Sequence, residues 1–192
     1  LMCNITLAKT AGFCFGVDRA IKLIEQLLSE GKKVATLGPI IHNPQVIEDF
    51  KSRGVDIVEH PSEVKDDTIL VLRTHGVTLD VLEEVEKSGV EFIDAACPFV
   101  KKIHNIVNEA WNDGKTVIIA GDGKHPEVMG INGWCGNSAI ILESPEEAQA
   151  AELAGGRREE EDRTGKSAIL SLKSGRKESE SCSSDVYASK NR

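Results

Sequence analysis

The chain has 192 residues, of which 40% are hydrophobic and 28% are charged, and this composition is typical of a soluble globular protein with a sizeable core. Its formal net charge of -8 argues against a nucleic-acid partner, because binding to phosphates requires clustered Lys and Arg. No segment reaches the roughly 18–20 apolar residues of a membrane span, and the first residues lack a signal-peptide pattern, so we expect a cytoplasmic protein without a membrane partner.

Helical and strand patterns alternate along residues 1–154. The first helix is predicted over 17–28 from its apolar spacing, with Gly31 placed to cap its end. Asn43 and Pro44 predict the N-cap and first position of the next helix. The remaining elements are strands at 34–37, 55–58, 69–73, 91–93, 117–120 and 140–142 and helices at 79–87, 100–111 and 145–153. Strands separated by helices predict parallel sheets in an α/β fold.

An internal repeat starts at residue 14 and again at residue 97, and the two copies align without a gap. Each copy reads Cys, helix, Gly-Lys, strand and Gly-x-x-x-His, so that Cys14 matches Cys97 and His42 matches His125. The repeat predicts two related modules, 1–96 and an incomplete one at 97–154. Residues 155–192 are rich in Ser and poor in large apolar side chains, so this low-complexity tail is expected to be disordered.

Cys14 and Cys97 each stand immediately before a predicted helix. A helix N-terminus favours the thiolate, which is the form that binds a soft metal. A free Cys is also often a small buried core residue, and this alternative stays open. Cys135 and Cys182 have no equivalent in the repeat, and no close Cys or His pairing indicates a zinc site.

Three histidines, His42, His75 and His125, follow predicted strand ends and lie close to Gly. Ligands of open parallel sheets bind at the carboxyl ends of the strands, so these imidazoles are candidate donors to a phosphate group. Each could instead be an ordinary satisfied polar residue. Glu127 could hold and deliver a proton beside them, or it could be an exposed first-turn residue. His60 and His104 are assigned no role.

Five motifs stand in order along the chain: Gly-Phe-Cys-Phe-Gly-Val at 12–17, Gly-Pro-Ile-Ile-His-Asn at 38–43, Arg-Thr-His-Gly-Val at 73–77, Asp-Ala-Ala-Cys-Pro at 94–98 and Gly-Lys-His-Pro-Glu-Val at 123–128. Together they resemble the 4-hydroxy-3-methylbut-2-enyl diphosphate reductase family over about residues 1–153. The resemblance implies the last step of the non-mevalonate isoprenoid pathway. In that step the allylic hydroxyl of the diphosphate substrate is removed reductively to give isopentenyl and dimethylallyl diphosphates.

The resemblance also implies a cofactor and roles for individual residues. A 4Fe–4S cluster is held by three cysteines in the family, two of which match Cys14 and Cys97, and ferredoxin or flavodoxin supplies electrons. By the same carry-over, His42, His75 and His125 contact the substrate, and Glu127 is the catalytic proton donor. Family members have three modules around a pseudo-threefold axis, so about two of the three are expected here.

The third module and its third cysteine are not recognisable in this sequence, because the neighbours of Cys182 share nothing with those of Cys14 and Cys97. Two other interpretations therefore stay open. One is an inactive truncated or frameshifted fragment of such an enzyme. The other is an unrelated α/β phosphate-binding module, for which the Gly and His residues at the strand ends suffice.

Overall fold

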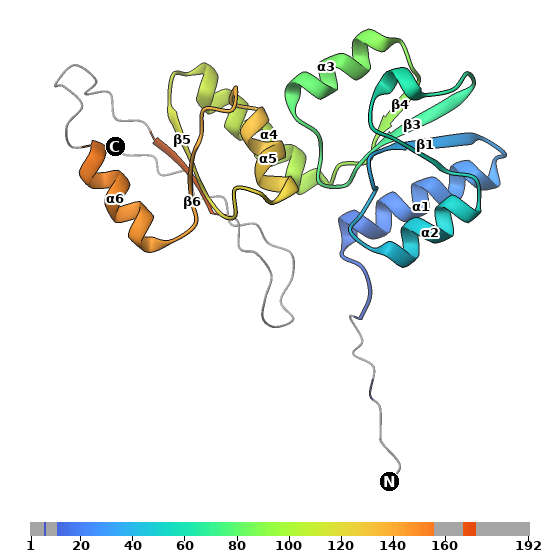
Figure 1. Cartoon of the computed structure of the whole chain (residues 1–192), viewed down its shortest axis with the longest axis horizontal. Helices are drawn as coiled ribbons and strands as arrows, with labels where there is room; N and C mark the ends of the chain where they lie inside the picture. Colours follow the sequence, from blue (N-terminus) through green and yellow to red (C-terminus); the bar gives the residue numbers. More distant parts are fainter. Residues whose placement is uncertain (1–5, 7–10, 156–166, 172–192) are drawn as a thin grey trace.

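The computed structural model of the chain describes residue 6 and residues 11–155 and 167–171. Within these residues the strands form two sheets, and every strand pairing is parallel. The predicted α/β fold with parallel sheets is thereby confirmed. Figure 1 shows the two sheets beside one another, each with its own helices. Residues 11–96 are called the first unit below, and residues 97–155 with 167–171 the second unit.

The first unit contains a four-stranded sheet with the order β2-β1-β3-β4. Its elements are α1 (Phe15–Ser29), β1 (Lys33–Leu37), α2 (Pro44–Ser52), β2 (Asp56–Val58), the 3-10 helix η1 (Pro61–Glu63), β3 (Thr68–Leu72), α3 (Leu79–Ser88) and β4 (Phe92–Asp94). All four strands are at the predicted places, with ends that shift by a single residue. The predicted N-cap Asn43 is confirmed, because its side chain accepts hydrogen bonds from the backbone N–H groups of Gln45 and Val46.

The central strands β1 and β3 are buried on both faces. Leu70 belongs to the core cluster packed under α3, and its neighbour Val71 belongs to the cluster packed under α1 and α2. Side chains of successive strand residues point to opposite faces, so both faces of this sheet are covered by helices. Polar side chains of a site can therefore be carried by the loops that follow the carboxyl ends of β1 and β3.

The second unit has a three-stranded sheet with the order β6-β5-β7. Its elements are α4 (Pro98–Asn112), β5 (Thr116–Ala120), α5 (Pro126–Gly133), β6 (Ile140–Leu142), α6 (Pro145–Gly155) and β7 (Ser167–Ser171). Its core cluster is built from α4, β5 and α5 and includes Val107, Ile119 and Ile131. The repeat is visible in the fold, because α1 and α4 have equal lengths and begin after Cys14 and Cys97 as N-caps.

Two elements differ from the predictions. Helix α5 is not among the predicted helices, because it has only 8 residues and contains Gly130 and Gly133, which disfavour a helix. Ser167–Ser171 form β7 beside β5, within the tail expected to be disordered. Its Ala-Ile-Leu run is too short to stand out from a Ser-rich context, and its backbone pairs with an existing strand.

Cys182 lies outside the described residues. Every helix in the described ranges is too short or too polar to span a bilayer.

Candidate functional site

Three histidines lie beyond the carboxyl ends of three strands. His42 follows β1, His75 follows β3, and His125 follows β5 of the other sheet. The imidazole ring centroids of His42 and His75 are 4.9 Å apart, and those of His75 and His125 are 6.2 Å apart. The structure thus brings together side chains from both units, with His75 between the other two.

The turn that carries His75 is fixed by its own hydrogen bonds. Gly76, at φ 74°, closes it by donating its N–H to the carbonyl of Arg73 at 3.0 Å, and Arg73 Nε donates back to the Gly76 carbonyl at 3.1 Å. The hydroxyl of Thr74, which is 3% exposed, donates to the Ile40 carbonyl at 3.0 Å. This last bond joins the loop after β3 to the loop that leads to His42.

His75 is neutral at pH 7 in the free protein. Burial is the main reason that its pKa is lowered from 6.5 to about 4, and the nearby His42, His125 and Arg73 lower it further. In the absence of an anion, His75 is therefore a neutral donor and carries no positive charge. A bound anion would raise this pKa, because its charge stabilises the protonated ring.

Glu127 lies one turn inside α5, beside His125. The Nδ1 atom of His125 accepts a hydrogen bond from the Glu127 backbone N–H at 3.2 Å, so the neutral ring carries its proton on Nε2. Burial raises the pKa of the Glu127 carboxyl, and the neighbouring His125 opposes that shift. Glu127 is half-buried, which contradicts the alternative of an exposed first-turn residue.

The two repeat cysteines stand at the N-termini of α1 and α4, and Cys97 packs against the first turn of α1. A Cβ atom placed on Gly16, two positions after Cys14 in the sequence, would lie 2.8 Å from Cys97 Sγ. Neither thiol caps its own helix through a side-chain hydrogen bond. Arg19 of α1 ties the two helix ends together by donating from Nη2 to the Ala96 carbonyl at 2.7 Å. Cys14 is exposed and Cys97 is half-buried.

This pair can provide two thiolate ligands but not a full ligand set. Among residues 11–155 and 167–171, no group of three or more His, Cys, Asp or Glu is arranged to hold a metal ion. An iron–sulfur cluster needs more thiolates than the pair supplies. The described residues alone therefore do not fit a complete cluster site.

Comparison with known proteins shows what this chain is related to. The family model described as LytB protein matches residues 5–172. The chain belongs to the LytB protein family. A 4-hydroxy-3-methylbut-2-enyl diphosphate reductase of Thermoanaerobacter sp. (strain X514) is 48% identical over 149 residues, which are 76% of this chain and 52% of that protein. The protein of that name from Clostridioides difficile (strain 630) is 40% identical over 156 residues, or 81% of this chain and 56% of that protein.

Solved structures of related enzymes share the fold of this LytB chain. The structure of an (E)-4-hydroxy-3-methyl-but-2-enyl diphosphate reductase, described as the terminal enzyme of the non-mevalonate pathway, matches with a TM-score of 0.68 and 36% identity over 91% of this chain and 60% of that one. The E-1-hydroxy-2-methyl-but-2-enyl-4-diphosphate reductase of Plasmodium falciparum matches with a TM-score of 0.72 and 25% identity over 85% of this chain and 49% of that one.

The LytB chain spans about half the length of the curated relatives it matches. The family match continues to residue 172 and so includes β7, although the sequence resemblance is expected to end near residue 153. Strand β7 is therefore part of the region that matches the family.

Four residues at the site of this LytB chain were not predicted from its sequence. Thr74 and Arg19 act through the hydrogen bonds described above, and His104 and Trp134 lie behind the His75 turn. One pattern could have indicated His104, because it falls on the apolar face of α4 with Val100, Ile103 and Val107. Thr74 stands inside a quoted motif, but nothing in the sequence shows that it is buried.

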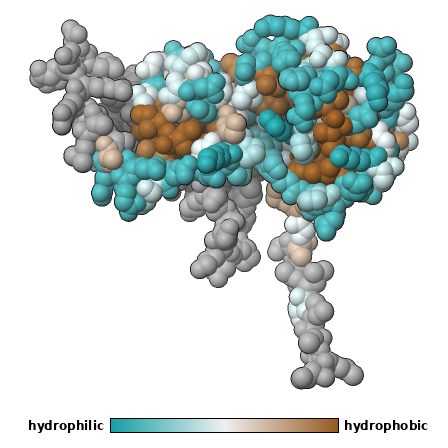
Figure 2. Space-filling view, in the orientation of Figure 1, coloured by the Kyte–Doolittle hydropathy of each residue, from teal (hydrophilic) through white to brown (hydrophobic). Residues whose placement is uncertain are grey.

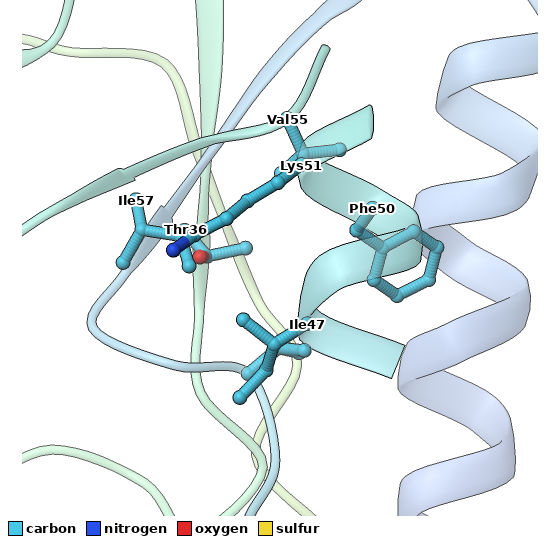
Figure 3. A pocket seen from close by; sticks show the side chains of 7 residues that line it. Thr36, Ile47, Phe50, Lys51, Val55 and Ile57 are labelled. Atoms are coloured by element: carbon cyan, nitrogen blue, oxygen red, sulfur yellow. The ribbon is translucent and has the colours of Figure 1, made fainter. Parts of the chain in front are cut away.

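Neither of two cavities in the described part of the LytB chain is lined by His42, His75 or His125. The one in Figure 3 measures about 10 Å³, which is room for a single water molecule, and its lining is mostly apolar, with Thr36 and Lys51 as the polar members. A larger cavity of about 220 Å³ lies behind the His75 turn at the junction of the units. Its lining includes Gly76, Val77, Asp94, Lys101, His104 and Trp134.

Proposed function

We propose that this chain carries the diphosphate-binding part of a LytB reductase that removes the allylic hydroxyl of 4-hydroxy-3-methylbut-2-enyl diphosphate. The observation that carries the proposal is the meeting of His42, His75 and His125, from three strand ends and both units, next to the half-buried Glu127. The names of the relatives supply the substrate and the reaction. In this proposal the first unit and the second unit, which are divided between residues 96 and 97, are two modules of a larger fold.

The histidines bind and orient the diphosphate in this proposal. His125 presents Nε2–H, because Nδ1 is engaged by the Glu127 N–H. His75 donates one hydrogen bond as a neutral ring and takes up a second proton once the anion raises its pKa. Holding the diphosphate away from the reacting carbon provides binding energy for orientation at the hydroxyl.

Glu127 holds the proton for the leaving oxygen. The carboxyl is already biased toward its protonated form, because burial raises its pKa. Glu127 lies at the start of α5, where its own N–H donates a hydrogen bond to His125. The proton donor and one phosphate-binding histidine are therefore held by the same helix.

Cys14 and Cys97 would supply two of the three thiolates of a 4Fe–4S cluster, with the third from outside the described residues. When bound, such a cluster delivers electrons and acts as a Lewis acid toward oxygen. The proposal includes ferredoxin or flavodoxin as the electron donor and a cytoplasmic location.

A second candidate function is diphosphate binding without reduction. It is favoured by the absence of a group of three metal-binding side chains among the described residues. In that case the histidine site works as a phosphate-binding module, and the chain is inactive as an enzyme by itself.

Anaerobic reconstitution with iron and sulfide separates these candidates. The reductase proposal expects visible absorbance of a cluster, about four iron atoms per chain, and turnover of the allylic diphosphate with a chemical reductant. Replacing Glu127 by Gln should abolish turnover and leave pyrophosphate binding intact. Iron-free protein that still binds pyrophosphate would support the second candidate and contradict the first.

Pyrophosphate binding tests the histidine site directly. Isothermal titration of the full chain should detect binding that is weakened at least about tenfold by His75→Ala, since hydrogen bonds to charged groups contribute about 1.5–3 kcal/mol. His60→Ala is the matched control, because His60 is exposed in a loop outside the site and should not affect binding. Equal affinities in both variants would contradict the site.

A further inference from the structure

The His75 turn rests on a side chain of the second unit. His104 of α4 is 3% exposed, and a Cβ atom placed on Gly76 would lie 2.5 Å from its Cε1 atom. Only a glycine lets the turn pack this closely on the ring, and the φ of 74° at Gly76 also favours glycine. The contact therefore places the imidazole of His104 directly behind the residue that follows His75.

Trp134 completes this support. Its indole ring stacks on the His104 ring, with centroids 4.9 Å apart and planes inclined by 20°. Its Nε1–H donates to the Val77 carbonyl at 2.9 Å. The stacked pair thus contacts both residues that follow His75, one through packing and one through a hydrogen bond.

Helix α5 touches the same turn at three points along its length. His125 at its N-cap lies next to the His75 ring, and Trp134 at its C-cap bonds to Val77. Between them, a Cβ atom placed on Gly130 would lie 3.5 Å from the His75 carbonyl oxygen and 3.9 Å from Nε2 of His104. One helix of the second unit therefore follows the turn from His75 to Val77.

His104 carries a polar atom that the local structure does not use. Among the residues that the structure describes, its buried Nε2 has no hydrogen-bond partner. Burial lowers the pKa of His104 to about 4, with Lys101 also lowering it and Asp94 opposing, so the ring is neutral at pH 7. Burying a polar ring atom without a hydrogen bond costs free energy of folding. A histidine at this core position therefore indicates that the shape of the ring and its contacts with Gly76 and Trp134 are needed.

We propose that His104 and Trp134 are positioning residues that hold the His75 turn against His125 and Glu127, so that the second unit sets the placement of a histidine carried by the first. The inference rests on the proposed function for the importance of His75, but the placement itself does not depend on any ligand. Neither residue touches the diphosphate in this arrangement. They act through Gly76 and Val77.

The experiment measures the pKa of His75 by NMR of the full chain with labelled histidines. Trp134→Phe keeps a ring on His104 but removes the donor to Val77, and His104→Ala removes the ring behind Gly76. In both variants the turn is released, so the pKa of His75 should rise from about 4 toward 6.5, the value of a solvated imidazole. Pyrophosphate affinity should fall about fivefold in Trp134→Phe, the equivalent of one hydrogen bond.

Trp111→Phe is the matched control, because Trp111 is the other tryptophan of the chain and packs on Gly136 instead of the turn. It should leave the pKa of His75 and the pyrophosphate affinity unchanged. Folded Trp134→Phe protein with an unshifted His75 pKa and unchanged affinity would overturn the inference. That variant decides the matter even where His104→Ala fails to fold. Wild-type chain that does not bind pyrophosphate would contradict the proposed function, while the ligand-free His75 measurement still tests the positioning role.

Discussion

The two sheets of the molecule differ in how their faces are covered. In β3 the neighbours Leu70 and Val71 are both 0% exposed, although they point to opposite faces. In β5 Ile119 is 0% exposed in the core, whereas its neighbour Ile118 is only half-buried. Ile118 pairs in register with Ile140 of β6, which is 38% exposed. Figure 2 shows an apolar area over this part of the second unit.

The difference shows that an apolar strand does not by itself guarantee cover on both faces. The sequences Thr-Ile-Leu-Val-Leu of β3 and Thr-Val-Ile-Ile-Ala of β5 both have the continuous apolar pattern of a strand buried between layers. In the described residues, helices complete that arrangement only for the first sheet. The apolar composition of β5 is typical of a strand buried on both faces, but the described helices cover only one face of its sheet.

Alanine substitutions at Leu70 and Val71 should give the largest loss of stability. Each removes a side chain that is 0% exposed, and together they probe both faces of β3. We expect Leu70→Ala to lower the free energy of unfolding by about 2–5 kcal/mol and Val71→Ala by about 2 kcal/mol. Urea denaturation followed by circular dichroism measures both. A cost at only one of the two positions would contradict two-sided burial of the first sheet.

Acidification should weaken both units through one histidine in each, the half-buried His75 and the buried His104. The pKa values of His75 and His104 are lowered from 6.5 to about 4, mainly by burial. The unfolded chain binds these protons below pH 6.5 and the native chain only near pH 4, so stability is complete above pH 6.5 and falls as pH decreases toward 4. His104→Gln should reduce this pH dependence.

Fluorescence distinguishes the units in that experiment, because both tryptophans, Trp111 and Trp134, belong to the second unit. Circular dichroism follows the helices of both units. The His104→Gln change should therefore be seen most clearly in the fluorescence-detected urea midpoint between pH 5 and pH 7. A fluorescence-detected midpoint that is constant over this range in the wild-type chain would show that His104 does not stay neutral on folding.

The sequence predicted best those features that depend on local pattern. Helix α1 follows from its apolar spacing, and Asn43 and Pro44 mark the start of α2 through cap chemistry alone. The meeting of His42 and His75 follows from the rule that parallel strands end at the same edge. These features required no knowledge of distant contacts.

Features that depend on distant contacts were missed. Helix α5 is stabilised by packing despite two glycines, and Gly133 faces Thr78 of the other unit so closely that no Cβ atom would fit. The burial of His104 depends on Gly76 and Trp134, which stand far from it in the sequence. Tertiary packing determines these features, and it cannot be predicted from helix propensity or from the periodicity of apolar residues.

Gly16→Ala should disturb the junction of the units at the two cysteines. An added Cβ atom would meet the Sγ and Cβ atoms of Cys97 at 2.8 and 2.9 Å, so α1 and α4 must separate. We expect a net loss of about 1–2 kcal/mol, since overpacking exceeds the gain of about 1 kcal/mol in helix propensity. Gly123→Ala is the matched control, because its nearest neighbour would lie at 3.5 Å. Equal unfolding midpoints for both variants would mean that Cys97 is not closely packed against Gly16.

Ile118→Ala should have the smallest effect, and it tests the open face of the second sheet most directly. Ile119→Ala, one residue along the same strand, removes a side chain that is 0% exposed and should cost about 2–5 kcal/mol. Ile118 loses less contact because it is already half-buried, so we expect about 1 kcal/mol or less by fluorescence-detected urea denaturation. Comparable costs at the two positions would show that the face bearing Ile118 and Ile140 is covered in solution, and the second sheet would then be two-sided like the first.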